Sequence, residues 1–287
     1  VVRTRDNGLM ISLEVTGIDG ITSGSSAITA LRAGFAHLLD TLDERFSFYL
    51  HRMMRPAQAQ LKPIHGQSFA ADIDRAWGGE LQRRNLQESV LILTVVRRQV
   101  APLAVPLFGK AAAKVWGEDT DRRLEELREV VSILETGLGV KSHRLNISDG
   151  TLIGFYASLL TGELRSKPRS AFGIIAEDAS DAAIRFGNGQ FAVEEGADTP
   201  RVGAVLYVKS YATSTWPGML DALGASRDTI ITHSYTPIER GSITERVKRR
   251  VAQMRASEDI AATIEAQLFE AADKSESGEL GFGIHQM

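Results

Sequence analysis

Residues 90–96 read VLILTVV, the longest compact run of apolar side chains in the chain. Its β-branched side chains fit a pleated sheet, and its length is that of a strand rather than a helix. The run is far shorter than the roughly 20 apolar residues that a membrane-spanning helix needs. It therefore predicts a buried strand over residues 88–97.

Strands and helices alternate on both sides of this strand. Residues 9–15 (LMISLEV) and 46–54 (FSFYLHRMM) have strand patterns, and Ser25 or Ser26 is expected to cap a helix between them. The other predicted elements of this half are helices over 68–84 and 119–136 and a strand over 140–147. The order β-α-β-α-β-α-β predicts an α+β fold of the split βαβ (ferredoxin-like) kind, with helices on one face of an antiparallel or mixed sheet.

The second half has a similar order of elements, which predicts a second ferredoxin-like half. Asn188-Gly189 predicts a type I′ hairpin turn. One helix over 241–275 would be about 50 Å long at 1.5 Å per residue. The remaining predicted elements are a helix over 151–161, a linker over 162–182, strands over 183–187, 190–195, 202–211 and 228–236, a helix over 217–223 and a final strand from 280. The expected domains are 1–147, a helix and linker over 148–182, and 183–287.

Composition limits the class of protein. The chain has 287 residues, of which 43% are hydrophobic and 24% charged, with a net charge of −3. These values are ordinary for a folded protein and argue against disorder and against a generic, basic nucleic-acid binder. The absence of cysteine excludes disulfide scaffolds, thiol nucleophiles and thiolate metal sites. Because it starts at Val1 and ends within a predicted strand, we expect the chain to be part of a longer polypeptide.

The sequence contains no recognisable catalytic motif. Residues 137–142 (GLGVKS) resemble a phosphate-binding loop, but their spacing is wrong and they follow a helix, so they predict a helix C-cap. The six histidines have no metal-ligand spacing, and no G-x-S-x-G motif is present. We therefore predict no catalytic residue, metal or cofactor in this chain. Two alternatives stay open: a free-standing α+β enzyme with a spatially assembled acid–base site, using His143 or His233, and a self-associating scaffold.

Two segments could bind a partner or a membrane surface. Residues 99–117 are apolar, are interrupted by prolines, and have lysine and tryptophan at the edge, which is typical of an interfacial or docking element. The helix predicted from residue 241 begins with a basic cluster, which could contact acidic headgroups or an acidic partner. The simpler interpretations are a buried loop and a solvated helix face. The candidate docking residues are Leu103, Val105, Leu107, Phe108, Lys110, Trp116, Arg246, Arg249 and Arg250.

Several sequence blocks resemble one known family. Residues 207–223 contain a K-x-Y…W-P-G-M-L-D pattern, which resembles the CagE/TrbE/VirB ATPases of type IV secretion and conjugation. Residues 45–51, 91–98 and 159–162 resemble other blocks of that family in the same order. So do residues 233–235 and 281–287, where His233 and Gln286 depart from the usual Gln and His. The residues of the main block are Lys209, Trp216, Pro217, Gly218, Met219, Leu220 and Asp221.

The resemblance implies a docking and assembly role. It implies the N-terminal domain of such an ATPase, with the motor, its Walker motifs, ATP and Mg lying after Met287. In the family this domain docks on the cytoplasmic side of the bacterial inner-membrane complex, which includes a short membrane-embedded subunit. The resemblance further implies self-association into a hexamer-type ring and mechanical coupling of the motor to the channel. The net charge separately argues against a specific nucleic-acid partner, and the two segments described above could make peripheral membrane contact.

Overall fold

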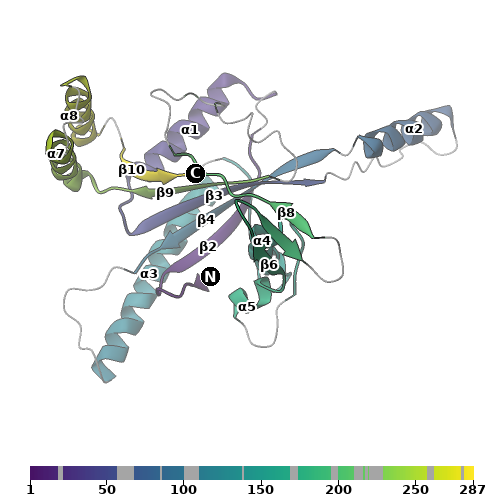
Figure 1. Cartoon of the computed structure of the whole chain (residues 1–287), viewed down its shortest axis with the longest axis horizontal. Coiled ribbons are helices and arrows are strands. Elements are labelled where there is room, and N and C mark those ends of the chain that lie inside the picture. Colours follow the sequence, from purple (N-terminus) through teal and green to yellow (C-terminus); the bar gives the residue numbers. More distant parts are fainter. Residues whose placement is uncertain are drawn as a thin grey trace. The chain divides into compact units, whose positions relative to one another are not determined.

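The structure, a computed structural model (Figure 1), forms two compact units. Unit 1 comprises Val1–Leu50, Leu93–Arg144 and His233–Met287, and unit 2 comprises His51–Ile92 and Leu145–Thr232. Each unit is thus built from separate stretches of the chain. The linear division into domains stays a prediction. The structure describes residues 1–18, 22–56, 68–84, 86–99, 110–137, 139–168, 174–194, 200–209, 216, 219, 229–256, 262–278 and 281–287.

Strands and helices alternate through the first half of the chain, as predicted. The strands are β1 Val2–Arg3, β2 Leu9–Val15, β3 Phe46–Pro56, β4 Gln87–Arg97, β5 Ser142–Arg144, β6 Ala183–Phe186, β7 Phe191–Glu194, β8 Arg201–Gly203, β9 Ile230–Pro237 and β10 Gly283–Gln286. The helices are α1 Ser25–Asp40, α2 Phe69–Arg83, α3 Lys110–Gly137, α4 Thr151–Thr161, α5 Ile175–Ala179, α7 Arg240–Ala256 and α8 Ala262–Glu276.

The larger sheet confirms the α+β class. Its strand order is β1-β2-β4-β3-β9-β10, and β5 pairs with β2. The order β5-β2-β4-β3 is that of a split βαβ arrangement, because β4 lies between the two strands that α1 connects. β9 and β10 pair antiparallel and extend this sheet, while β6, β7 and β8 form a separate antiparallel sheet. The second half of the chain therefore differs from the expected second copy of the first.

The core of unit 1 lies between the sheet and two helices. Alternate residues of β2, Leu9, Ile11 and Leu13, are buried against side chains of α1 and α3. This follows from the two-residue period of a strand, which places every second side chain on one face. Leu38 of α1 and Val131 of α3 belong to the same buried cluster. α1 and α3 thus cover one face of the sheet, as expected from the sequence.

The strands of this sheet are also joined by pairs of side-chain hydroxyls. The Ser12 and Thr94 hydroxyls are buried and lie 2.8 Å apart, joining β2 to β4. The Ser47 and Thr236 hydroxyls lie 2.9 Å apart, joining β3 to β9. Each hydroxyl can donate to one neighbour and accept from another, so these pairs satisfy polar groups that burial would otherwise penalise.

The predicted single helix over 241–275 is wrong. α7 and α8 pack against each other, with Val247 and Val251 of α7 in one apolar cluster with Ala272 of α8. In a continuous helix, Val251 and Ala272 would be about 31 Å apart. Burial of both apolar stripes against each other removes more apolar surface from water than one extended helix could.

Several smaller predictions also need correction. α1 has Gly24 at its N-cap and no side-chain cap, so neither Ser25 nor Ser26 caps it. α3 begins at Lys110, within the apolar segment, and α5 lies within the predicted linker. The strands predicted over 140–147 and 202–211 are shorter, as β5 and β8. The helix predicted over 217–223 lies outside the described residues, except for Met219.

Unit 2 contains the small sheet, with α4 and α5. The hairpin of β6 and β7 is present, and Gly189 has φ 77° at its turn. Asn188 does not have positive φ, whereas a type I′ turn needs it at both central residues, so the predicted turn type is wrong. In α4, Phe155 lies edge-on to the His51 ring, and the Ser158 hydroxyl lies 3.6 Å from the Met53 sulfur.

Among the helices described, none has the length and apolar character to cross a bilayer.

Candidate functional site: an arginine network at the ends of the apolar segment

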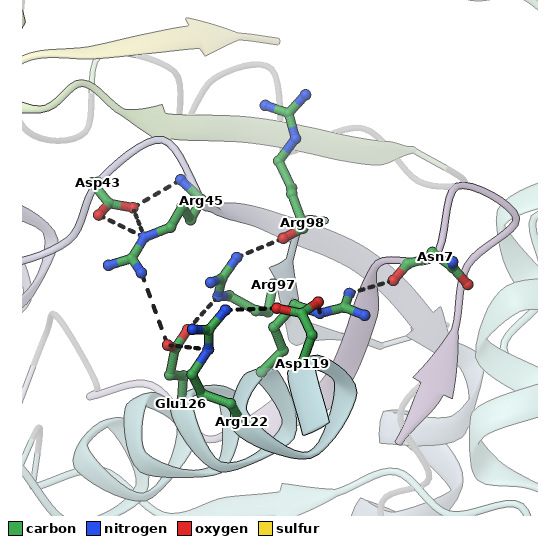
Figure 2. Close-up of polar contacts among 9 residues, drawn as sticks. Asn7, Asp43, Arg45, Arg97, Arg98, Asp119, Arg122 and Glu126 are labelled. Carbon is green, nitrogen blue, oxygen red and sulfur yellow. Dashed lines mark hydrogen bonds and ion pairs between the residues drawn. The ribbon is translucent and has the colours of Figure 1, made fainter. Parts of the chain in front are cut away.

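Arginines and carboxylates connect the two ends of the apolar segment 99–117 (Figure 2). Arg97 and Arg98 precede the segment at the end of β4. Asp119, Arg122 and Glu126 follow it on α3. We call the residues that these contacts join the arginine network: Asn7, Asp43, Arg45, Arg97, Arg98, Asp119, Arg122, Arg123 and Glu126. All of them belong to unit 1.

Arg97 is the buried centre of the arginine network. Its side chain is only 3% exposed, and its Nε donates to Glu126 Oε2 at 2.6 Å. Its Nη1 donates to the Arg98 carbonyl at 2.6 Å, and its guanidinium lies over the Phe46 ring. A buried cation needs such compensation, because removal of one partner leaves an unpaired charge at a cost of about 3–5 kcal/mol. The pair thus holds the end of β4 against α3.

Arg45 extends the network to the loop between α1 and β3. Its Nε donates to both carboxylate oxygens of Asp43, at 2.9 and 2.8 Å, and its Nη1 lies 3.8 Å from Glu126. Burial alone would raise the pKa of Asp43, but the hydrogen bonds from Arg45 outweigh it and lower that pKa. The hydrogen bond with Asp43 likewise raises the pKa of Arg45. The backbone N–H of Arg98 donates to the Arg45 carbonyl at 2.7 Å, which ties the two strands together.

Asp119 lies on α3 and takes part, through Arg123, in the contact between this helix and the turn between β1 and β2. It pairs with Arg122 at 2.6 Å and with Arg123 at 2.9 Å. Arg123 is buried, and its Nη1 donates to the Asn7 carbonyl at 2.6 Å. Asn7 adopts φ 65°, a left-handed conformation that asparagine tolerates in turns. Arg123 thereby fixes the turn between β1 and β2 to α3.

The basic cluster of α7 lies next to this network. Arg246 of α7 pairs with Glu44, the residue before Arg45. Glu239, just before α7, also acts electrostatically on Arg45. Arg249 and Arg250 are exposed and make no ion pair with any residue that the structure describes. Arg246, Arg249 and Arg250 are spaced i, i+3 and i+4, so they lie on one flank of the helix.

Only some of the predicted docking residues can be placed. Leu103, Val105, Leu107 and Phe108 lie outside the described residues. Lys110 and Trp116 belong to α3, but their side chains lie outside the description. Arg246, Arg249 and Arg250 lie together on α7. The network was not predicted as a unit, although the sequence places Arg97 and Arg98 at a strand end beside the apolar segment.

The W-P-G-M-L-D block is only partly described. Lys209 is exposed, and Trp216 is 62% exposed. The Met219 N–H donates to the Trp216 carbonyl at 3.2 Å, which indicates a turn. Pro217, Gly218, Leu220 and Asp221 lie outside the described residues.

The histidines include one pair that the sequence spacing did not predict. His233 of β9 and His285 of β10 lie on paired strands, with Nδ1 and Nε2 3.1 Å apart. Burial, and then the neighbouring His285, lower the pKa of His233. His143 is exposed on β5, away from this pair in the sequence. No group of three or more metal-ligating side chains occurs among the residues described.

Comparison with known proteins identifies the family. Residues 1–103 match the family described as type IV secretion system ATPase VirB4/TrbE, N-terminal domain. Residues 138–287 match the CagE, TrbE, VirB family, component of type IV transporter system. A search of curated proteins finds no match. The second match alone covers more than half of the chain, and residues 104–137 lie between the two. The chain therefore belongs to the CagE/TrbE/VirB family of type IV secretion system ATPases.

Proposed function

We propose that this chain is the docking and assembly domain of a type IV secretion or conjugation ATPase. It would attach the motor to inner-membrane subunits of the secretion complex on the cytoplasmic face. The family gives other secretion subunits as partners, and a short membrane-embedded subunit and a hexamer-type ring are part of the proposal. Turnover of ATP with Mg is assigned to a motor domain, since no phosphate-binding loop occurs in this sequence.

The observation that carries the proposal is the arginine network at the ends of segment 99–117. The contacts of Arg97, Glu126 and Asp119 hold the chain in place immediately before and after this apolar segment. A docking element held at both ends loses less conformational entropy on binding than a freely moving one. The network would also transmit force, because within unit 1 it joins the start of β3 and the end of β4 to α3.

The test is capture of the full chain by its membrane subunits. Leu103→Glu plus Leu107→Glu should reduce co-purification with the inner-membrane complex by about tenfold or more, because two charges would enter an apolar interface. The control is Val205→Glu plus Leu206→Glu, which makes the same change at exposed positions of unit 2. Equal capture of both variants and the unchanged chain would overturn the proposal. Circular dichroism of each variant establishes that it is folded.

A further inference from the structure

We propose that unit 1 binds the anionic phospholipid surface of a membrane through arginines of α3, α7, the loop before β3 and the end of β4. We call these residues the arginine surface: Arg45, Arg98, Arg122, Arg246, Arg249 and Arg250. The inference rests on the proposed function, because only a domain docked at the inner membrane would meet such lipids. It adds a partner of different chemistry from the protein subunits.

The arginine surface is continuous from the end of β4 to α7. The backbone N–H of Arg98 donates to the Arg45 carbonyl at 2.7 Å. Arg45 and Arg122 share Glu126, at 3.8 and 3.9 Å. Glu44, adjacent to Arg45, pairs with Arg246 on α7. Arg249 and Arg250 follow one turn later on the same flank of that helix. Each contact links one element to the next, so the arginines form one surface rather than scattered charges.

The charges on this surface do not cancel. Four nearby acids are paired with arginines: Asp43 with Arg45, Glu44 with Arg246, and Asp119 and Glu126 with several arginines each. The exposed Glu239 and Glu245 offset part of the remaining positive charge, and the exposed Lys248 of α7 adds to it. Arg249 and Arg250 are exposed and have no carboxylate partner in the described part of the chain. In Figure 2 the Arg98 guanidinium points away from Glu126 and the other carboxylates drawn. The surface therefore has positive charge available for an anionic partner.

A lipid surface fits these residues better than a protein partner. Protein interfaces depend on a few hot-spot side chains, most often Trp, Tyr or Arg, that are packed in fully desolvated pockets. Arg249 and Arg250 are instead exposed on the surface of α7. Attraction to acidic headgroups needs no such pocket, and arginine forms paired hydrogen bonds with phosphate oxygens. Charge complementarity alone can therefore account for binding.

The experiment measures sedimentation of the full chain with vesicles in the absence of any secretion subunit. We expect binding to phosphatidylcholine vesicles containing phosphatidylglycerol, and none to phosphatidylcholine alone. Arg249→Glu plus Arg250→Glu should weaken partitioning by about 30-fold or more. Raising the salt from ~0.1 M to ~1 M should abolish binding, because the Debye length falls from about 10 Å to about 3 Å.

The matched control is Arg83→Glu plus Arg84→Glu at the C-terminal end of α2. These arginines are also adjacent and exposed, Arg83 as the last residue of α2 and Arg84 as its C-cap, so the change in net charge is the same. Both form an ion pair with Glu80. Unchanged partitioning of this control supports the proposal, whereas an equal loss would show a nonspecific effect of net charge and overturn it. Arg249→Lys plus Arg250→Lys should retain most of the binding.

Other outcomes separate this inference from the proposed function. If the chain binds polyglutamate but no anionic vesicle, the partner is an acidic polypeptide and the lipid proposal fails. If the chain binds vesicles but membrane subunits do not capture it, the protein-docking proposal fails and the lipid proposal stands. If membrane subunits capture the chain but it binds no vesicles, the lipid proposal fails and the protein-docking proposal stands.

Discussion

Arg97 and Glu126 are 29 positions apart in the sequence, and a 2.6 Å hydrogen bond from Nε to Oε2 joins them. Between them lies the whole apolar segment 99–117. The pair therefore closes a loop at its base, where the arginine is buried and the glutamate is partly exposed. Its contribution to stability can be measured separately from any binding function.

Loss of Glu126 should destabilise the fold. Glu126→Gln removes the counter-charge of the buried Arg97 but keeps an amide oxygen that can accept its hydrogen bond. The free energy of unfolding should therefore fall by about 2–3 kcal/mol, less than the cost of removing the partner altogether. Urea denaturation followed by circular dichroism measures this change. Glu125→Gln is the control, because Glu125 is exposed on the same helix and should change stability by less than about 0.5 kcal/mol. Similar effects of both variants would contradict a special role for the pair.

Two glycines in helices should respond oppositely to alanine. In α4, a Cβ at Gly154 would lie 1.8 Å from the Arg165 carbonyl oxygen, so Gly154→Ala should destabilise by about 3 kcal/mol or more. In α2, nothing lies within 4 Å of a Cβ at Gly79. Gly79→Ala should therefore stabilise by about 0.5–1 kcal/mol. Thermal melting of both variants tests the prediction, and two shifts of the same sign would refute it.

Burial of His51 should make the fold sensitive to mild acid. Burial lowers the pKa of His51 from 6.5 to about 4, and its Nδ1 lies 3.0 Å from the Thr232 hydroxyl. Above pH 6.5 both folded and unfolded chains hold His51 neutral, so its contribution is fully present. Between pH 6.5 and 4 only the unfolded chain takes up the proton, which costs the fold about 3 kcal/mol by pH 4 at about 1.4 kcal/mol per pKa unit.

His51→Gln should remove this part of the acid sensitivity. Its free energy of unfolding, from urea titrations at several values of pH, should change less between pH 6.5 and 4 than that of the unchanged chain. His233 also has a lowered pKa, so some slope will remain. The control is His143→Gln on the exposed surface of β5. If His51→Gln has the same pH dependence as the unchanged chain, His51 does not titrate as described.

The α7–α8 hairpin can be distinguished from one long helix by a distance measurement. The Thr244 hydroxyl donates to the Glu276 carboxylate, yet a continuous helix would separate these residues by about 48 Å. Because the chain has no cysteine, Thr244→Cys plus Glu276→Cys provides two unique spin-label sites. Electron–electron distance spectroscopy should give a separation below about 25 Å, since packed helix axes lie about 8–10 Å apart. A separation near 48 Å would show one helix.

The sequence predicts local elements well where one periodic pattern agrees with the turns beside it. β2 has the predicted bounds 9–15, because Leu9, Ile11 and Leu13 alternate and a turn precedes them. α4 likewise spans the predicted 151–161, between Gly150 and Gly162, which both have positive φ. In such segments local preference and tertiary packing favour the same structure.

Long-range contacts decide the features that the sequence did not predict. The residues between α7 and α8 include no proline or glycine, so local preference favours one helix. Two helices form instead, because the packing of Val251 in one apolar cluster with Ala272 outweighs this local preference. His233 and His285 meet only because β9 pairs with β10, and Arg97 meets Glu126 only because α3 packs on the sheet. No spacing rule connects residues that are so far apart along the chain.

The position of α7 and α8 between two paired strands also bears on how this fold can change over time. β9 and β10 pair antiparallel from Ser234 to Pro237 and from Gly283 to Gln286, which is the geometry of an ordinary hairpin. Pairing of β9 with β10 therefore requires only that the chain between them leaves the end of β9 and returns to the start of β10. Each doubling of such a connection costs only about 0.6 kcal/mol in closure entropy. Insertions, deletions and whole-module exchange are thus tolerable here, making this hairpin a natural site of divergence and of engineered fusions.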